Sequence, residues 1–151
     1  MATSARIARY CSLLFISYVI ENPFSSRIWL TSEFRELRSA GAEFGRTDFC
    51  AFNTPWRKST GFLYWNFGSL AEMFRACSNE NGRCKFTNRR HIILQGKDSS
   101  GMWMTRRAQP YPREMCRQIA HHLLQQCTSW KWIGVKGELL FPRFRNTFDH
   151  H

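Results

Sequence analysis

Short blocks of apolar residues recur along this chain, and the pattern inside each block predicts one element of secondary structure. Residues 4–12 are rich in good helix formers, and Ser4 at their start is an N-cap candidate. Residues 13–20 are almost all apolar, and several are β-branched or aromatic, which predicts a strand buried on both faces. A helix followed by such a strand is half of an α/β unit.

The rest of the pattern alternates helices with short strands, as expected for an α/β protein. An apolar face with helical spacing predicts a turn and a short helix over residues 25–37. Helices are also predicted at residues 69–77 and 112–126, the second with Pro112 in its first turn, and the polar residues 79–90 are predicted to be a loop. The predicted strands cover residues 47–52, 61–65, 91–95 and 102–107.

The tripeptide Glu21-Asn22-Pro23 ends the apolar run and places a carboxylate and an amide directly after the first predicted strand. Pro23 cannot continue a central strand, and it biases Asn22 toward an extended conformation. Ligands of open α/β sheets bind at the edge where the strands end. Glu21 and Asn22 are therefore candidate site residues.

Two later blocks follow in order. The first, Phe52-Asn53-Thr54-Pro55-Trp56-Arg57-Lys58-Ser59-Thr60, is a proline turn before a strand, and it can direct Arg57 or Lys58 at a phosphate or a base carbonyl. The second spans residues 109–120, where Tyr111-Pro112 opens a helix. Taken singly, the blocks are also consistent with an exposed basic turn and with a capped helix packed on the sheet.

Together the three blocks resemble the second half of the DNA cytosine-5 methyltransferase family, in its divergent phage or mobile-element type. There a strand ends in Glu-Asn-Val or Glu-Asn-Pro, and Phe-Gly-x-Pro-x-x-Lys-x-Thr follows. A later proline turn opens a helix that ends in an Ala-Ile-Ala-like sequence, where this chain has Arg117-Gln118-Ile119-Ala120. The resemblance covers most of residues 6–124 and implies a partial Rossmann-like methyltransferase core with a small basic insert.

By this resemblance Glu21 would hydrogen-bond the Watson–Crick edge of a flipped cytosine, a role that suits an acceptor carboxylate. Lys58 stands where the family places an Arg that contacts the base carbonyl. The implied catalytic residues are thus Glu21, Asn22 and Lys58. Thr60 replaces the family's second Arg, and Asn53 replaces its usual Gly, although Asn tolerates positive φ better than most residues.

Two parts that the family carries upstream of Glu-Asn are not found: a glycine-rich cofactor turn and a Pro-Cys pair for the catalytic thiolate. We therefore expect an inactive or incomplete relative that binds S-adenosylmethionine only if upstream sequence completes it. Whether the protein is an enzyme is left open. The alternatives are a non-enzymatic basic nucleic-acid-binding module from a mobile element and a zinc-stabilised interaction domain.

A formal net charge of +11 and a pI near 10.0 favour a polyanionic partner. A solvated basic surface would also explain the charge, but nucleic acid is favoured because Arg outnumbers Lys heavily and the guanidinium fork suits phosphate. We expect nucleic acid, and DNA by the resemblance. The candidate contact residues are Arg57, Arg83, Lys85, Arg89, Arg90, Arg106 and Arg107.

The six cysteines are dispersed, which favours reduced thiols in an intracellular protein over a disulfide framework. Cys77, Cys84 and His91 form a Cys-x6-Cys-x6-His pattern that is a candidate zinc site. A structural zinc takes four protein ligands, so Cys116, His121 or His122 would have to fold back as the fourth. The simpler alternative is a buried cysteine, a loop cysteine and a loop histidine.

The length predicts a single domain, which we place at residues 1–127 with the basic insert at about 75–108, followed by a tail at 128–151. No apolar stretch approaches the ~18 residues of a membrane span, so no membrane partner is expected. We expect the nucleus or cytoplasm. Residues 1–20 also have features of a weak transit peptide, so organelle targeting is not excluded. The oligomeric state is not predicted.

Overall fold

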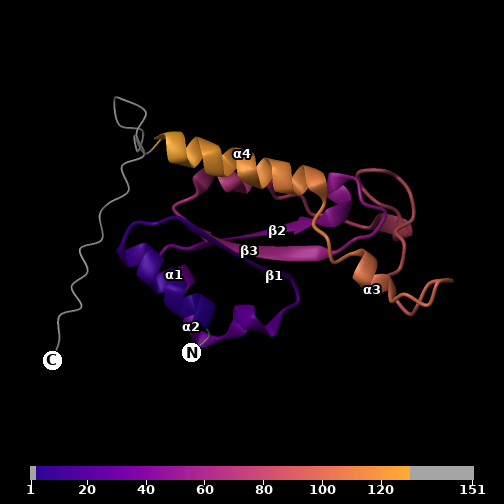
Figure 1. The fold of residues 1–151 in the computed structure, drawn as a ribbon, viewed down its shortest axis with the longest axis horizontal. Coiled ribbons are helices and arrows are strands. Elements are labelled where there is room, and N and C mark those ends of the chain that lie inside the picture. The colour runs from indigo at the N-terminus through magenta and orange to yellow at the C-terminus, as the bar shows by residue number, and fades with distance from the viewer. Residues whose placement is uncertain (1–2, 130–151) are drawn as a thin grey trace.

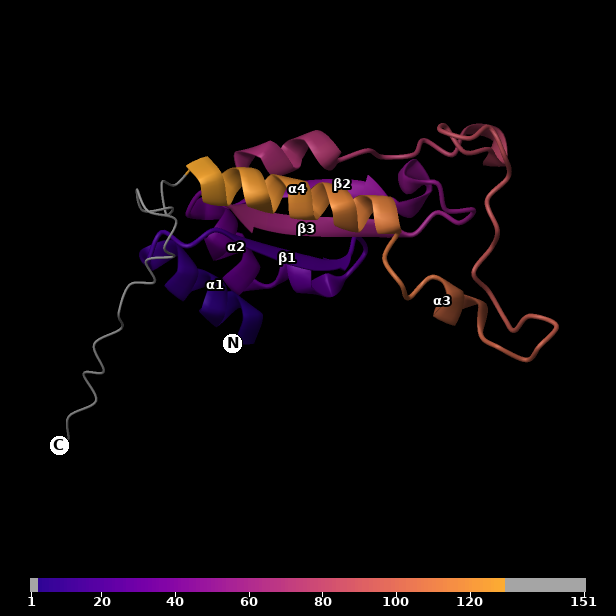
Figure 2. The same ribbon diagram turned by 45° about the horizontal axis from the view of Figure 1, so that its top comes forward.

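The computed structural model describes residues 3–129, in which helices cover both faces of a small sheet (Figure 1). Figure 2 shows the sheet between α4 on one side and α1 with α2 on the other. Short 3-10 helices η1 (Arg27–Leu30), η2 (Phe49–Phe52), η3 (Gly68–Met73) and η4 (Glu80–Gly82) lie in the connections. The main elements are α1 (Thr3–Leu13), β1 (Tyr18–Pro23), α2 (Ser32–Ser39), β2 (Glu43–Asp48), β3 (Ser59–Trp65), α3 (Met104–Arg107) and α4 (Arg113–Ser129).

The sheet has the strand order β1-β3-β2, and the central strand β3 is antiparallel to both neighbours. Leu63 lies opposite Ile20 on one side and Phe44 on the other, which fixes the register. Residues Thr60 to Tyr64 are all buried, because helices cover both faces of β3. This explains why β3 is a continuous apolar run rather than an alternating one.

Two apolar cores lie on the two faces of the sheet. Phe62 and Tyr64 point into a core formed with η2, η3 and α4, where Met115 is fully buried. Leu63 points into the other core, formed with α1 and α2. Ala5 and Ala8 of α1 are buried there, because small side chains let the helix approach closely. The sheet and its two helical layers therefore hold η2 and the start of α4 on the same face.

The predicted strand at residues 13–20 is wrong in its first half. Helix α1 continues to Leu13, and the chain then turns at Phe15, whose φ is 55°. Leu13 and Phe15 are 74% and 72% exposed, so this part of the apolar run is not in the core. The strand is Tyr18–Pro23, and Glu21-Asn22-Pro23 lies inside it rather than after it. Pro23 is tolerated because β1 is an edge strand, where one side needs no backbone donor.

The other elements agree in part with the predictions. The strand at 61–65 is confirmed as β3, and the helix at 112–126 is confirmed as α4. The predicted strand at 47–52 is wrong in position: β2 ends at Asp48, and the next residues form η2. In place of a helix at 69–77 there is the 3-10 helix η3, and the helix at 25–37 is divided into η1 and α2.

The predicted strands at 91–95 and 102–107 are also wrong. Residues 104–107 form α3, and pairing in this region is limited to the isolated bridges Arg83–Arg90 and Lys97–Trp103. Ile93 is 73% exposed, because no sheet neighbour covers this segment. The fold is thus mixed α/β with a three-stranded antiparallel sheet. Within residues 3–129 no helix has the length and apolarity needed to cross a bilayer. Of the predicted tail at 128–151, residues 128 and 129 belong to α4, and residues 130–151 lie outside the described residues.

Candidate metal centre

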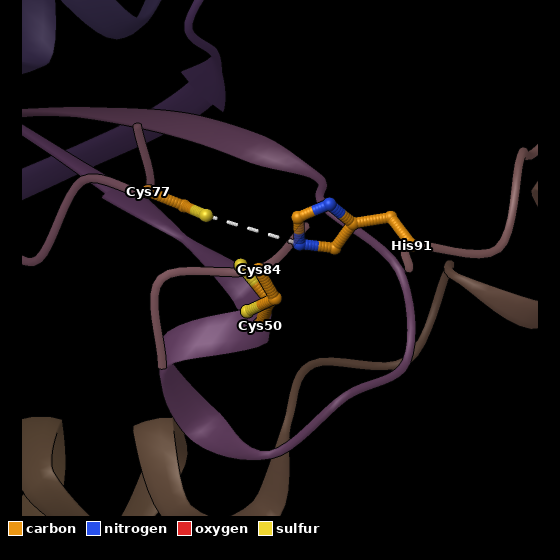
Figure 3. Close-up of side chains that lie close together, drawn as sticks. All are labelled: Cys50, Cys77, Cys84 and His91. Atoms are coloured by element: carbon orange, nitrogen blue, oxygen red, sulfur yellow. Dashed lines mark hydrogen bonds between the residues drawn. The ribbon is translucent and has the colours of Figure 1, made fainter. Parts of the chain in front are cut away.

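Three cysteines and a histidine converge beside the carboxyl end of β2 (Figure 3). They are Cys50 of η2, Cys77 after η3, Cys84 after η4, and His91. One ligand atom from each residue lies within 4.8 Å of the ligand atoms of the other three. The three cysteines are buried and His91 is half-buried, so the cluster is closed off from bulk water on most sides.

Cys50 reaches the cluster because the chain turns inward after β2. Phe49 and Phe52 of η2 are buried in the core, and Cys50 between them is 1% exposed. Asn53 closes η2 with a φ of 64°, a conformation that Asn adopts more readily than most residues. The same turn then leads to Lys58 and β3. The position of Cys50 is therefore set by the core.

Cys77 is fastened to the sheet by the buried carboxylate of Asp48. The backbone N–H of Cys77 donates to Asp48 Oδ2 at 2.7 Å, and the Asp48 N–H donates to the Arg75 carbonyl at 3.0 Å. Arg46 forms an ion pair with this carboxylate at 3.1 Å, and the Ser59 hydroxyl also donates to it. A fully buried carboxylate is tolerated because these donors compensate its lost hydration.

Cys84 lies at the start of a tight turn. Its N–H donates to the Arg89 carbonyl at 2.8 Å, and the Asn88 N–H donates back to the Cys84 carbonyl at 2.8 Å. Burial acts to raise the pKa of the Cys84 thiol, but hydrogen bonds from Thr87 and from the Phe86 amide outweigh it and lower the pKa to about 6. The turn thus favours the thiolate, which is the form that binds metals.

Asn79 orients the His91 ring. The two side chains are joined at 2.8 Å through His91 Nδ1 and Asn79 Oδ1, and the amide oxygen can only accept. Nδ1 therefore carries the proton, and Nε2 presents its lone pair to Cys77 Sγ at 3.8 Å. Asn79 itself has a φ of 55°, so the backbone conformation of the turn directs its side chain. Such an outer partner fixes the tautomer of a metal-binding histidine.

These four groups can hold one metal ion in a tetrahedral site. A Zn–S bond of about 2.3 Å puts tetrahedral sulfur atoms about 3.8 Å apart, which is compatible with the observed spread of ligand atoms. Burial, together with the neighbouring thiols of Cys84 and Cys77, raises the pKa of Cys50. A cation would compensate for the burial of thiolates here. Because protein atoms would fill all four positions, such a site has a structural rather than a catalytic design.

The sequence pattern identified three of the four residues of this cluster. Cys77, Cys84 and His91 come together as predicted, but Cys50 completes the group. The proposed fourth ligands Cys116, His121 and His122 all lie on α4 and are outside the cluster. Cys50 is far upstream of Cys77, so no short spacing signals it. The signal that could have found it is its place between Phe49 and Phe52, two aromatic residues that form part of the core.

The three sequence blocks that contain Glu21, Lys58 and Tyr111 also meet in space. The Tyr111 hydroxyl donates to the Glu21 carboxylate, and burial followed by this hydrogen bond raises the pKa of Tyr111. Lys58 Nζ lies 5.5 Å from the Tyr111 ring centroid and donates to the Ala108 carbonyl at 3.2 Å. Asn22 pairs with Gly61 in the sheet beside them. Glu21 and Lys58 thus contact the same aromatic side chain.

The predicted basic residues lie in three places. Arg57 is in the turn before β3, Arg106 and Arg107 are on α3, and the remaining four surround Cys84. All of them are exposed. The four residues around Cys84 are Arg83, Lys85, Arg89 and Arg90. The side chain of Arg83 donates to the Asn88 carbonyl at 2.9 Å, so it also supports the Cys84 turn.

Comparison of the chain with models of protein families, with curated proteins and with solved structures gave no match.

Proposed function

We propose that this protein binds nucleic acid through the basic loop 83–90, and that a structural zinc ion at Cys50, Cys77, Cys84 and His91 holds this loop on the core. The observation that carries the proposal is the convergence of the four ligand atoms within 4.8 Å, directly beside four exposed cations. The resemblance to cytosine-5 methyltransferases favours DNA as the partner.

Zinc fits this donor set better than the other common metals. Calcium and magnesium prefer oxygen ligands, whereas three thiolates and an imidazole suit a tetrahedral zinc. The loop needs such an anchor because it and the residues after it make few apolar contacts: Phe86 is 39% exposed, and Ile92 is 44% exposed. A metal bond at Cys84 and at His91 would therefore fix both ends of the basic segment.

The basic loop that the metal would anchor has a surface suited to nucleic acid. Arg83, Lys85, Arg89 and Arg90 lie within one short loop, and their side chains are exposed. Backbone phosphates are the ligands that such clusters recognise, and binding releases counterions from the nucleic acid. The hydrogen bond from Ile92 N–H to the Pro55 carbonyl, at 2.8 Å, also links this loop to the turn that carries Arg57. This bond holds the Arg57 turn beside the segment that follows the basic loop.

Fluorescence anisotropy with a labelled DNA duplex tests the binding. We expect sequence-tolerant affinity that falls steeply between roughly 50 and 200 mM salt. Replacing Arg83, Lys85, Arg89 and Arg90 together with Ser should weaken it and flatten the salt dependence. The matched control replaces Arg6, Arg9, Arg35 and Arg38, four exposed arginines on α1 and α2, in the same way. Equal losses in the two variants would show that net charge, rather than the loop, binds DNA.

Metal analysis of the purified protein tests the zinc. We expect one zinc per chain, and a cobalt-substituted protein should show thiolate-to-cobalt charge-transfer absorption. Purified protein that holds no zinc, takes up no cobalt and melts at the same temperature with and without a chelator would contradict the proposal.

A second candidate function is base recognition of the cytosine-5 methyltransferase type, and the meeting of Glu21, Lys58 and Tyr111 favours it. A carboxylate and an ammonium group held on one aromatic ring could contact the edge of an extruded base. The sequence contains no glycine-rich cofactor turn and no Pro-Cys pair, so the residues present do not fit S-adenosylmethionine. We therefore expect residues 1–151 to transfer no labelled methyl group to DNA. If the wild-type protein transfers the methyl group and the Glu21→Gln variant does not, this expectation is wrong.

A further inference from the structure

Residues 96–107 form a small, internally bonded platform that includes α3 and lies beyond one end of the sheet (Figure 2). The Asp98 carboxylate accepts hydrogen bonds from the backbone N–H groups of Ser100 at 2.9 Å and Met102 at 3.0 Å. Asp98 N–H donates to the Met102 carbonyl at 2.8 Å. An ion pair of 2.7 Å between Arg107 and Asp98 then fastens α3 to the turn. These bonds order the platform without an apolar core of its own.

Trp103 is presented on the surface of this platform. It is 59% exposed, although its large apolar ring would be stabilised by burial. Lys97 Nζ lies 5.1 Å from the ring centroid, so a cation rests against the indole. Arg106 and Arg107 follow on α3, and both are exposed. The platform therefore combines an open aromatic surface with Lys97 and Arg106, whereas Arg107 is paired with Asp98.

The platform is also tied to the body of the protein near the Lys58 turn. Ala108 follows α3 directly and is buried, and its carbonyl accepts a hydrogen bond from Lys58 Nζ at 3.2 Å. The chain continues from there to Tyr111, which contacts Glu21. A ligand bound at Trp103 would thus lie near a fixed part of the fold rather than at the end of a free loop.

This arrangement is better suited to single-stranded than to double-stranded nucleic acid. Exposed aromatic rings beside cations bind single strands, because each unpaired base offers a free π-face for stacking. In a duplex the bases already stack on one another, and a surface ring can reach only phosphates and sugars. Cations alone would bind both forms, so the exposed indole is the feature that favours a single strand.

We propose that residues 96–107 bind a single-stranded segment of nucleic acid, with an unpaired base stacked on the open surface of Trp103 and a phosphate held by Arg106. This inference rests on the proposed nucleic-acid binding and adds the kind of strand that one part of the surface recognises. The loop 83–90 contacts phosphates of either form, and the platform selects the unpaired one.

The test compares the full chain and its variants on a labelled oligothymidylate and on a labelled duplex of the same length. Trp103→Ala should weaken binding of the single strand about tenfold and leave duplex binding nearly unchanged. Trp103→Phe should restore most of the loss, because a phenyl ring still stacks. The control is Tyr10→Ala, which removes an aromatic side chain 63% exposed on α1 and should change neither affinity.

The outcomes separate this inference from the function on which it rests. If the single strand binds no better to the wild-type protein than to Trp103→Ala, the stacking proposal fails even when the duplex still binds. An equal loss on both ligands would also overturn it, because the residue would then act through the fold or through charge. If neither ligand binds the wild-type protein, the proposed function itself fails. Thermal melts confirm that each variant is folded.

Discussion

The phenol of Tyr111 donates a hydrogen bond to the carboxylate of Glu21, and the two residues are 90 positions apart in the chain. The contact joins the edge strand β1 to the segment that leads into α4. The Tyr111 ring also lies 5.7 Å from the Phe49 ring, next to the turn that carries Cys50. Tyr111 therefore connects the edge strand β1 to the element that supplies one metal-ligand candidate.

Glu21→Gln and Tyr111→Phe should each destabilise the fold by less than about 1.5 kcal/mol, because the bond is exposed and water can replace it. Val19→Asp should cost much more, since Val19 packs against the core beneath α4 and the new carboxylate would have no compensating donor. Urea unfolding of the three variants measures these costs. A loss from Glu21→Gln as large as that from Val19→Asp would identify Glu21 as a structural residue.

The sequence predicted the apolar elements where a single periodicity applied. The strand at 61–65 and the helix after Pro112 are confirmed, because helices cover both faces of β3 and a proline marks the helix start. The apolar run 13–20 was wrongly predicted to be one strand, because its residues belong to two elements: Leu13 ends α1, whereas Tyr18 begins β1. No local rule separates these roles, since the boundary depends on which residues the tertiary core can reach.

The candidate metal site shows the same limit. Two loop cysteines and a histidine at equal spacing indicated a site, but spacing cannot identify a ligand that arrives from another part of the chain. Cys50 follows β2 directly. Cys77 is held beside it, because the Cys77 N–H donates to the buried Asp48 at the end of β2. The basic residues near Cys84 were predictable from the sequence. The position of α3 apart from them was not, because it depends on the path of the connecting loops.

Gly45→Ala should destabilise the protein by about 1–3 kcal/mol, as overpacking of a core does. A Cβ atom at Gly45 would lie 2.1 Å from the Phe74 ring. That ring cannot move aside easily, because it packs against Phe62 and Tyr64 at centroid distances of 5.8 and 5.4 Å. The matched control is Gly68→Ala, whose Cβ would meet nothing within 4 Å. Thermal melts in which both variants match the wild type would contradict this packing.

Cys84→Ser should abolish zinc binding and lower the melting temperature, because it removes one of the four proposed ligands and leaves the others buried. At a hundredfold excess of free zinc over its Kd, the bound ion would stabilise the fold by about 2.7 kcal/mol. Cys116→Ser is the control, since this cysteine is exposed on α4 and outside the cluster. Zinc titration of the chelator-treated proteins, followed by calorimetry, separates the two. Retained zinc in Cys84→Ser would exclude the assigned ligand set.

The platform around Trp103 should loosen in acid. The Ser100 hydroxyl, more than any other group, lowers the pKa of Asp98 below its ordinary value of 3.8, so the folded state favours the ionised carboxylate. Its contribution to stability is therefore present above pH 3.8 and is lost as the pH falls through the lower pKa of the folded state. Amide hydrogen exchange of Ser100 and Met102 should accelerate in this range beyond the intrinsic pH effect. Asp98→Asn should remove that pH dependence; an unchanged profile would show that Asp98 does not order the turn.

Asn79→Gly should weaken zinc binding by about 10–100-fold, the usual effect of losing an outer partner of a metal-binding histidine. Glycine keeps the φ of 55° without strain, so the substitution removes the amide that accepts from His91 Nδ1 and preserves the backbone. Asn81→Gly is the matched control, because Asn81 has a φ of 51° in the same turn. Competition with a chromophoric chelator measures both affinities. Equal affinities would mean that His91 is oriented without Asn79, whereas a loss confined to Asn79→Gly would support His91 as a zinc ligand through Nε2.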